Sequence, residues 1–207
     1  ARGEYGRARE AFLNALSIFE KNSGANHPDV ARVLNHLANA YSNEGDYRAA
    51  LPLYRRALTI SEKNRGGYNP FVAEVLSNLF KLSLATGDVG GAIEYQARAI
   101  PIVNRNIELN LASGSERWKL AYLSSLSDTT DRTISLHLKF APNDQVARTL
   151  AALSVIQRKG RVQDAMSESL AALRRRSSPQ DQALLDRLGL TTAQLARLIL
   201  NGPEQMN

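Results

Sequence analysis

The stretch Gly45-Asp46-Tyr47-Arg48-Ala49-Ala50 decides the fold, because the chain carries three versions of it. An earlier copy begins at Gly3 as Gly-Glu-Tyr-Gly-Arg-Ala, and a later, more divergent copy begins at Gly87 as Gly-Asp-Val-Gly-Gly-Ala. The starting glycines are 42 residues apart (45 − 3 and 87 − 45). A constant step of this size is typical of stacked structural repeats. Repeat arrays build extended surfaces, so the pattern favours a binding protein over an enzyme.

Apolar residues inside the repeats follow a helical period. They include Leu34, Leu37, Ala38 and Tyr41 in one repeat, and Leu76, Leu79 and Phe80 in the next. Ser83 is the polar exception, because it stands 42 residues after Tyr41 (83 − 41). Pro28 and Pro70 precede these runs, as expected at helix N-termini, where the missing N–H of proline costs nothing. Glycines follow the runs, where a helix must stop and turn back.

Each repeat is therefore predicted to be a pair of helices, A and B, joined by the glycine turn. We expect A helices over 29–43 and 71–85, and B helices over 4–22, 46–64 and 88–105. The first B helix has no A partner in the sequence, so we expect the chain to be excised from a longer protein.

These residues carry a family resemblance. The positions Leu34, Leu37, Ala38, Tyr41, Gly45, Ala50, Tyr54 and Ala57 resemble the signature of tetratricopeptide repeats. The usual repeat has about 34 residues, and the 42-residue step is similar to the longer kinesin-light-chain class. The resemblance covers residues 1–104. It implies an all-α, right-handed superhelix, an α-solenoid, with two and a half repeats.

In tetratricopeptide arrays the A helices line a concave groove, so the resemblance implies a protein or peptide ligand there. The predicted groove residues are Arg32, Asn35, Asn39, Ser42, Asn43, Glu74, Ser77 and Lys81. Asn35 and Asn39 match the family's groove asparagines, whose amides both donate to and accept from a peptide backbone. Lys81 is suited to a peptide carboxylate. For any single residue, a solvated polar face is an equally good interpretation.

The 42-residue register ends after Asn104. Its next turn glycine would fall at position 129 (87 + 42), where the sequence has Thr129. Helical patterning continues, so residues 105–207 are predicted to form a divergent helical extension toward a missing downstream domain.

Two features divide this extension. Ala141-Pro142-Asn143-Asp144 is a predicted break. The five-residue spacing from Gly160 to Ala165 then repeats that from Gly45 to Ala50, which predicts one more helix pair over 143–176, with its turn at Gly160.

Stretches of the extension carry a second resemblance. They are Gly114 to Leu123 with Asp131 to Leu138, Gln157 to Ala165, and Ala183 to Leu185 with Leu195 to Leu198. Together they resemble the region that joins repeats to protease in bacterial CHAT-domain proteins. The resemblance implies a regulatory region followed by a caspase-like domain that uses a His and a Cys. The chain has no cysteine, so no catalytic residue carries over.

Composition limits the classes of protein to which the chain can belong. The 207 residues are 43% hydrophobic and 22% charged, as in ordinary soluble proteins. The absence of cysteine excludes disulfides and thiolate metal sites and fits a reducing compartment. No apolar run approaches the ~20 residues that span a bilayer. We therefore expect a cytoplasmic protein without a membrane partner.

The net charge of +6 allows a competing hypothesis. The basic excess gathers at Arg158, Lys159, Arg161, Arg174, Arg175 and Arg176. These residues could form a nucleic-acid-sensing patch, although a solvated helix surface is the simpler interpretation. No aromatic residues interleave with them, which disfavours single-stranded nucleic acid. A structural self-assembly spacer is the third hypothesis, because the ends of a truncated array invite stacking.

The sequence offers no enzyme signature, and we expect neither catalysis nor a cofactor. Its histidines, His27, His36 and His137, are scattered, whereas a metal site needs converging ligands. Gly90-Gly91 lacks the Lys-Ser/Thr of a phosphate loop and is interpreted as an eroded repeat turn.

Overall fold

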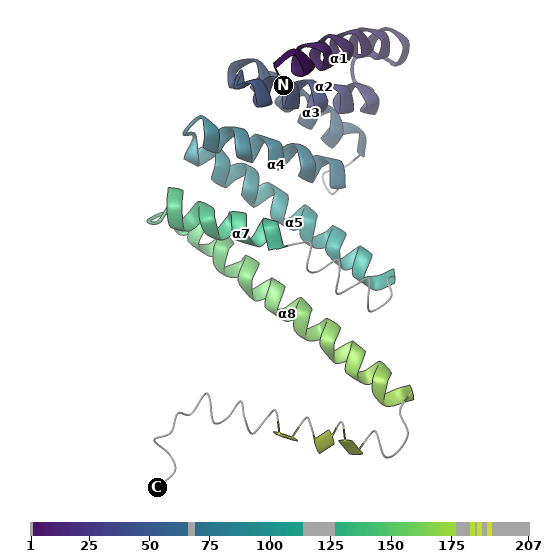
Figure 1. The fold of residues 1–207 in the computed structure, drawn as a ribbon, viewed down its shortest axis with the longest axis vertical. Helices are drawn as coiled ribbons and strands as arrows, with labels where there is room; N and C mark the ends of the chain where they lie inside the picture. The colour runs from purple at the N-terminus through teal and green to yellow at the C-terminus, as the bar shows by residue number, and fades with distance from the viewer. Residues whose placement is uncertain are drawn as a thin grey trace.

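The protein is a stack of helices (Figure 1). The structure, a computed structural model, describes residues 2–65, 69–113 and 127–176, with short pieces at 183–184, 186–187 and 190–191. These residues contain no strand. The elements are α1 (Arg2–Ser23), α2 (Pro28–Glu44), α3 (Tyr47–Arg65), α4 (Pro70–Ala85), α5 (Val89–Ser113), α7 (Ser127–Ser135), the π-helix η1 (Leu136–Phe140) and α8 (Gln145–Arg176).

The predicted helical-repeat architecture is confirmed. Helices α2 and α3 form one A/B pair and α4 and α5 the next, and α7 with η1 lies beside α8 as a further pair (Figure 1). The A helices begin and end within one residue of their predicted bounds. Helix α5 is the exception among the B helices, because it continues to Ser113 instead of ending near residue 105.

Both A helices begin in the same way. Pro28 and Pro70 occupy the first turns of α2 and α4, as the sequence predicts. The residue before each proline is extended and caps the helix: His27 Nδ1 accepts from the Asp29 N–H at 3.2 Å, and Asn69 Oδ1 accepts from the Phe71 N–H at 2.9 Å. A capping acceptor satisfies one of the free N–H groups at a helix start.

The glycine turns end the A helices. Gly45 has φ of 83° and Gly87 has φ of 76°, in the left-handed region that a side chain disfavours. The N–H of Gly45 donates to Ser42 O at 3.1 Å, and the Asp46 N–H donates to Tyr41 O at 2.9 Å. These two bonds satisfy carbonyls at the end of α2, as in the Schellman motif.

An aspartate starts each of the last three B helices. Asp46 Oδ1 accepts from the Ala49 N–H at 3.0 Å, Asp88 Oδ1 from Gly91 at 2.9 Å, and Asp144 Oδ1 from Ala147 at 2.8 Å. The steps between the aspartates are 42 (88 − 46) and 56 (144 − 88) residues. The break predicted at Ala141–Asp144 is therefore the next repeat turn, displaced by 14 residues (56 − 42).

The predicted helix pair over 143–176 is wrong. These residues, from Gln145 to Arg176, form the single helix α8, and Gly160 lies inside it without a turn. Gly45 and Gly87 are each followed by an aspartate that caps the next helix, whereas Gly160 is followed by Arg161, which has no capping acceptor. A lone helical glycine costs about 1 kcal/mol relative to alanine, which a long helix tolerates.

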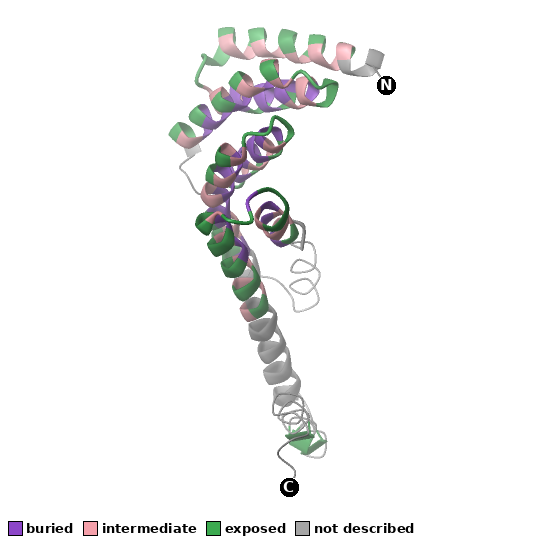
Figure 2. Cartoon of the chain, turned by 90° about the vertical axis from the view of Figure 1, so that its left-hand side faces the viewer, coloured by how far each residue is buried: buried purple, intermediate pink, exposed green. Residues whose placement is uncertain are grey.

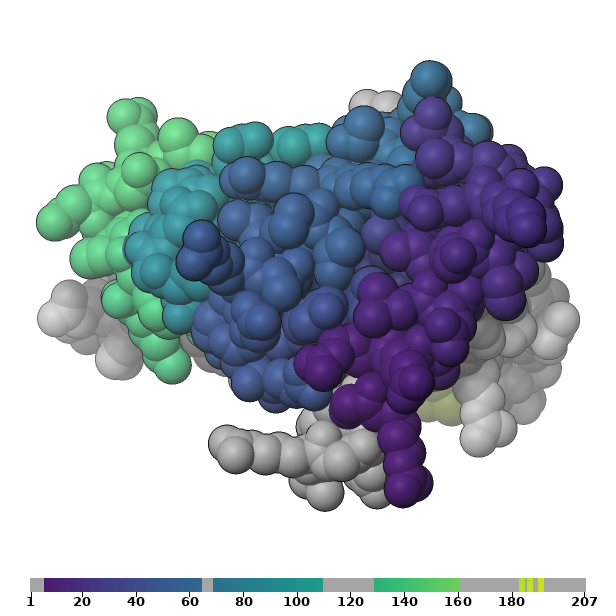
Figure 3. All heavy atoms as spheres, turned by 90° about the horizontal axis from the view of Figure 1, so that it is seen from above, coloured from purple at the N-terminus to yellow at the C-terminus, as the bar shows by residue number. Residues whose placement is uncertain are grey.

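The core lies between the stacked helices, where buried residues concentrate (Figure 2). The small residues Ala50, Ala57 and Ala92 are fully buried, and Tyr54 fills the space beside them. Leu136 of η1 belongs to the same core, so this segment packs on the repeats. None of the described α1 side chains (6–23) is buried. Helix α1 lies at one end of the stack (Figure 1) and faces the viewer when the molecule is seen from that end (Figure 3).

Polar bridges link successive B helices. Arg56 Nη2 lies 2.6 Å from Glu20 Oε1, and Arg98 Nη2 lies 2.6 Å from Glu62 Oε1, with both partners shifted by 42 residues. Asn104, 42 residues after Glu62, donates instead to Gln157 Oε1 of α8 at 2.8 Å. Residue 104 thus lies within α5, so the division into residues 1–104 and 105–207 stays a prediction that falls inside a helix.

Candidate functional site

The predicted groove residues lie on α2 and α4, but the structure uses them differently. Asn35 is fully buried. Its Nδ2 donates to Glu74 Oε1 at 2.9 Å, and its Oδ1 accepts from Asn78 Nδ2 at 3.0 Å. The amide of Asn35 therefore joins two repeats rather than facing a ligand.

Asn39, one turn further along α2, is only half-buried. Its Oδ1 accepts a hydrogen bond from the hydroxyl of the buried Tyr54. Burial raises the pKa of Tyr54 to about 12, against a smaller lowering by a hydrogen bond with Ser42. The Tyr54 hydroxyl thus stays protonated near neutral pH and orients Asn39. The Asn39 NH₂ group has no hydrogen-bond partner among the described residues.

The other α2 residues of the predicted groove are at the surface. Arg32 is exposed and pairs with Asp29 at the helix start. Ser42 is half-buried and Asn43 is exposed. These side chains are accessible, and Arg32 already has a charged partner.

On α4 the predicted residues again divide. Glu74 is exposed and accepts from Asn35, and Ser77 Oγ accepts from Arg132 Nη1 of α7 at 2.6 Å. Lys81 is exposed and forms no ion pair within the described part of the chain. Lys81 stands 42 residues after Asn39 (81 − 39). The Asn39 NH₂ group and the Lys81 ammonium group, neither of which has a partner among the described residues, therefore occupy the same position in successive repeats.

The structure adds two residues that the sequence did not single out. Asn78 belongs to the Asn35 network, and Arg132 bridges α7 to Ser77. Asn78 stands in register with His36 (78 − 36 = 42), so only its polarity could have marked it. Arg132 could not be placed, because α7 lies beyond the point at which the register shifts.

The predicted basic patch lies on α8. Arg158 is half-buried, with Nη1 3.9 Å from Asp131 Oδ1, and Lys159 is exposed. Val155 and Ile156, which precede them by a few residues on α8, are exposed. The surface is therefore of mixed character here. The side chains of Arg161, Arg174, Arg175 and Arg176 lie outside the described residues.

The histidines make structural contacts. His27 caps α2, the His36 ring stacks on Phe12 with centroids 5.6 Å apart, and His137 Nδ1 lies 3.1 Å from Ala141 O. The described part of the chain holds no group of three metal-ligating side chains. Among the same residues, no helix combines the length and the apolar content needed to cross a membrane.

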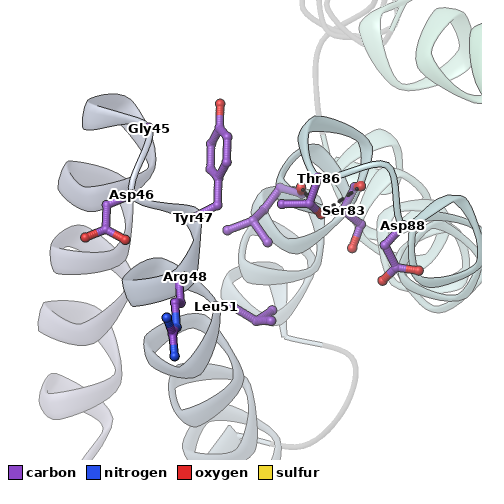
Figure 4. Close-up of a pocket in the computed structure, with 9 residues that line it drawn as sticks. Gly45, Asp46, Tyr47, Arg48, Leu51, Ser83, Thr86 and Asp88 are labelled. Carbon is purple, nitrogen blue, oxygen red and sulfur yellow. Dashed lines mark hydrogen bonds between the residues drawn. The ribbon is translucent and has the colours of Figure 1, made fainter.

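A pocket of about 500 Å³ opens between the α2–α3 turn and the end of α4 (Figure 4). Its lining residues are Gly45, Asp46, Tyr47, Arg48, Leu51, Leu82, Ser83, Thr86 and Asp88. We call it the turn pocket. It lies at the turn end of the helices, and none of the predicted groove residues lines it.

Comparisons with known proteins agree with this geometry. A family model described as tetratricopeptide repeat matches residues 1–63 and 29–105. BtubC (BKLC) from P. vanneervenii has a similar structure, with 25% identity and a TM-score of 0.59 over 76% of this chain. The match covers 58% of BtubC, so the chain spans little more than half of that protein's length.

A second solved structure holds nearly identical TPR-like repeats attributed to a kinesin light chain of Podosopora anserina. It shows 19% identity and a TM-score of 0.46, covering 84% of this chain and 90% of that chain. No curated protein matches the sequence.

Proposed function

The chain belongs to the tetratricopeptide-repeat family, and from this premise we propose that it binds an extended peptide segment along α2 and α4. Repeats of this family serve as protein-interaction scaffolds. The proposed ligand site centres on Asn39 and Lys81, with Arg32, Ser42 and Asn43 beside them.

One observation carries the proposal: Asn39 and Lys81 keep unused binding groups at the same position of successive repeats. The hydroxyl of Tyr54 donates to the Asn39 oxygen, which leaves the Asn39 NH₂ available to donate to a backbone carbonyl of the proposed ligand. Lys81 supplies a cation for a carboxylate in the same segment. Asn35, by contrast, is buried and uses both its amide nitrogen and its amide oxygen in hydrogen bonds that stabilise the scaffold.

The proposed wider context is the regulatory region of a bacterial, cytoplasmic CHAT-type protease, without the protease itself. The packing of the repeats against α7 supports such a role. Gln96 Nε2 donates to the buried Thr133 Oγ1 at 2.6 Å, and Arg132 reaches Ser77 beside the proposed site. Occupancy could shift the helices after residue 105 only if the ligand prefers one of their arrangements. Of the CHAT-like stretches, 114–123 and 195–198 lie outside the described residues.

The test begins with capture from bacterial lysate, with and without nuclease, at low and high salt. The affinity of the captured protein is then measured by calorimetry for Asn39→Ala, Lys81→Glu and the control Lys63→Glu, an exposed lysine on α3. We expect each site variant to lose about tenfold in affinity, or ~1.4 kcal/mol, with unchanged helical content. The control should bind normally.

Two outcomes would reject the site. Unchanged affinity in both site variants would remove the groove assignment. Capture that disappears with nuclease or high salt would instead favour nucleic-acid binding through the basic α8 residues, because phosphate contacts weaken steeply with salt.

Self-assembly is a second candidate, favoured by the exposed apolar face of α1. Ile18 is 58% exposed, whereas Ile60, at the same position one repeat later, is 3% exposed. Exposed apolar surface of this kind favours association. Sedimentation velocity over a concentration series tests it: Ile18→Gln should abolish any dimer, and Ser17→Gln should not.

A further inference from the structure

The turn pocket arises where two repeats differ at equivalent positions. Ser83, Leu51 and Thr86 of the pocket stand 42 residues after Tyr41, Arg9 and Glu44 (83 − 41, 51 − 9 and 86 − 44). The two sets of residues therefore occupy matching places in successive repeats.

In the earlier repeat this place is filled by the chain itself. The guanidinium carbon of Arg9 lies 5.3 Å from the centre of the Tyr41 ring, and Arg9 Nη1 lies 2.7 Å from Glu44 Oε2. A cation above an aromatic face is an attractive arrangement. The fold thus accommodates an aromatic ring between the end of an A helix and the preceding B helix.

In the later repeat the ring is missing. Serine replaces tyrosine at position 83, and Figure 4 shows the open space between the α2–α3 turn and the end of α4. The side chains of Tyr47, Leu51 and Leu82 supply apolar lining. Apolar surface around an open pocket is the usual setting for a buried ligand group.

The pocket wall also contains a polar residue, Ser83. Ser83 lines the pocket and is only 2% exposed, so a polar residue stands in the pocket wall. A serine hydroxyl both donates and accepts hydrogen bonds, so a ligand group that carries its own hydroxyl suits this wall.

We propose that the turn pocket binds the side chain of a tyrosine in a partner protein. The ring would enter from solvent and occupy the space that the Tyr41 ring fills in the earlier repeat. Its hydroxyl would meet Ser83 Oγ at the wall. The lining includes two carboxylates, Asp46 and Asp88, and one cation, Arg48, so a segment without acidic neighbours fits best. This inference rests on the proposed protein-binding function and adds a site away from the groove.

The test uses small probes, so it needs no identified partner. N-acetyl-tyrosinamide, N-acetyl-phenylalaninamide and N-acetyl-leucinamide are titrated into ¹⁵N-labelled full chain and followed by NMR. We expect saturable shifts at residues 45–51 and 82–88, strongest for tyrosinamide and weakest for leucinamide. Equal responses to all three amides, or no saturable shift, would overturn the proposal.

The decisive variant places the residue of the earlier repeat at the equivalent position of the later one. Ser83→Tyr restores the residue of the earlier repeat, so its ring should fill the pocket and abolish the shifts. Ser17→Tyr makes the same chemical change on the exposed face of α1 and should leave the titration unchanged. An unchanged titration in folded Ser83→Tyr would also overturn the proposal.

A second variant covers misfolding of Ser83→Tyr. Leu51→Ala removes apolar lining from a half-buried position and should weaken tyrosinamide binding several-fold. Unaltered binding in this variant would count against the site. Asn39→Ala and Lys81→Glu should bind the amides normally, so failure of the pocket and failure of the groove are distinguishable.

Discussion

The side-chain amide of Asn35 donates a hydrogen bond of 2.9 Å to Glu74 across the boundary between two repeats. Asn78 completes the link by donating to the Asn35 oxygen at 3.0 Å. Asn35 is fully buried and Glu74 is exposed, so the bond runs from the core to the surface. This network connects α2 to α4 and explains a polar residue in an apolar stripe.

Asn35→Ala should therefore destabilise the fold. It removes both hydrogen bonds of a fully buried amide, which together contribute about 1–3 kcal/mol, although the exposed Glu74 can turn to water. Urea unfolding followed by circular dichroism measures the change. Asn43→Ala is the control, since Asn43 is exposed and should shift stability by less than about 0.5 kcal/mol. Equal effects in the two variants would contradict the network's role.

Two glycines should respond in opposite directions to alanine. Gly160 lies inside α8 with nothing within 4 Å of an added Cβ, so Gly160→Ala should stabilise by about 0.5–1 kcal/mol. Gly45 has φ of 83°, so Gly45→Ala should destabilise by roughly 1 kcal/mol or more. Thermal unfolding compares them. If Gly160→Ala instead lowered the stability, the result would support the turn that the sequence predicted at Gly160 and contradict a continuous helix.

Ala50→Leu should overpack the contact between neighbouring helices. Ala50 is fully buried in the core, and added methylenes in such a place cost roughly 1–3 kcal/mol. Ala11→Leu adds the same volume at an exposed position of α1 and should be nearly neutral. The midpoints of denaturant unfolding measure the difference in stability between the two variants, provided that the unfolding free energy depends equally on denaturant concentration in both. An Ala50→Leu variant with unchanged stability would mean that the contact at Ala50 is loosely packed.

Tyr54 should make stability fall at high pH. Burial raises its pKa from the ordinary 10.0 to about 12, so the folded state holds the proton more tightly than the unfolded chain. Its contribution is complete below pH 10.0 and is lost as pH rises toward about 12. Urea unfolding of the protein and of Tyr54→Phe across this range isolates the effect. Parallel pH dependence in the two proteins would contradict the assignment.

The repeat helices were predictable because their signals are local. Proline starts, glycine stops and helical spacing of apolar residues place α2 and α4 within one residue of their bounds. The extension was less predictable. Asp144 caps α8 as Asp46 and Asp88 cap the earlier B helices. It stands 14 residues beyond the position that the 42-residue step predicts (56 − 42), so its equivalence to the earlier aspartates could not be recognised from the repeat spacing.

Residue type alone was insufficient to predict which side chains form the candidate site. Asn35 and Asn39 are both asparagines one helical turn apart, and the sequence treated them alike. The structure buries Asn35 against α4 and leaves Asn39 half-open. The same holds for Ser83, which stood out as polar but whose pocket depends on α3 and the α2–α3 turn.

The sequence by itself determined the helical pairs, their 42-residue step and the family, because backbone signals act within a few residues of each other. Tertiary structure alone decided which amides are used in the scaffold and that a pocket opens at Ser83. Burial and cavity volume depend on residues from the neighbouring repeat, and their distance in space is not encoded in any local pattern.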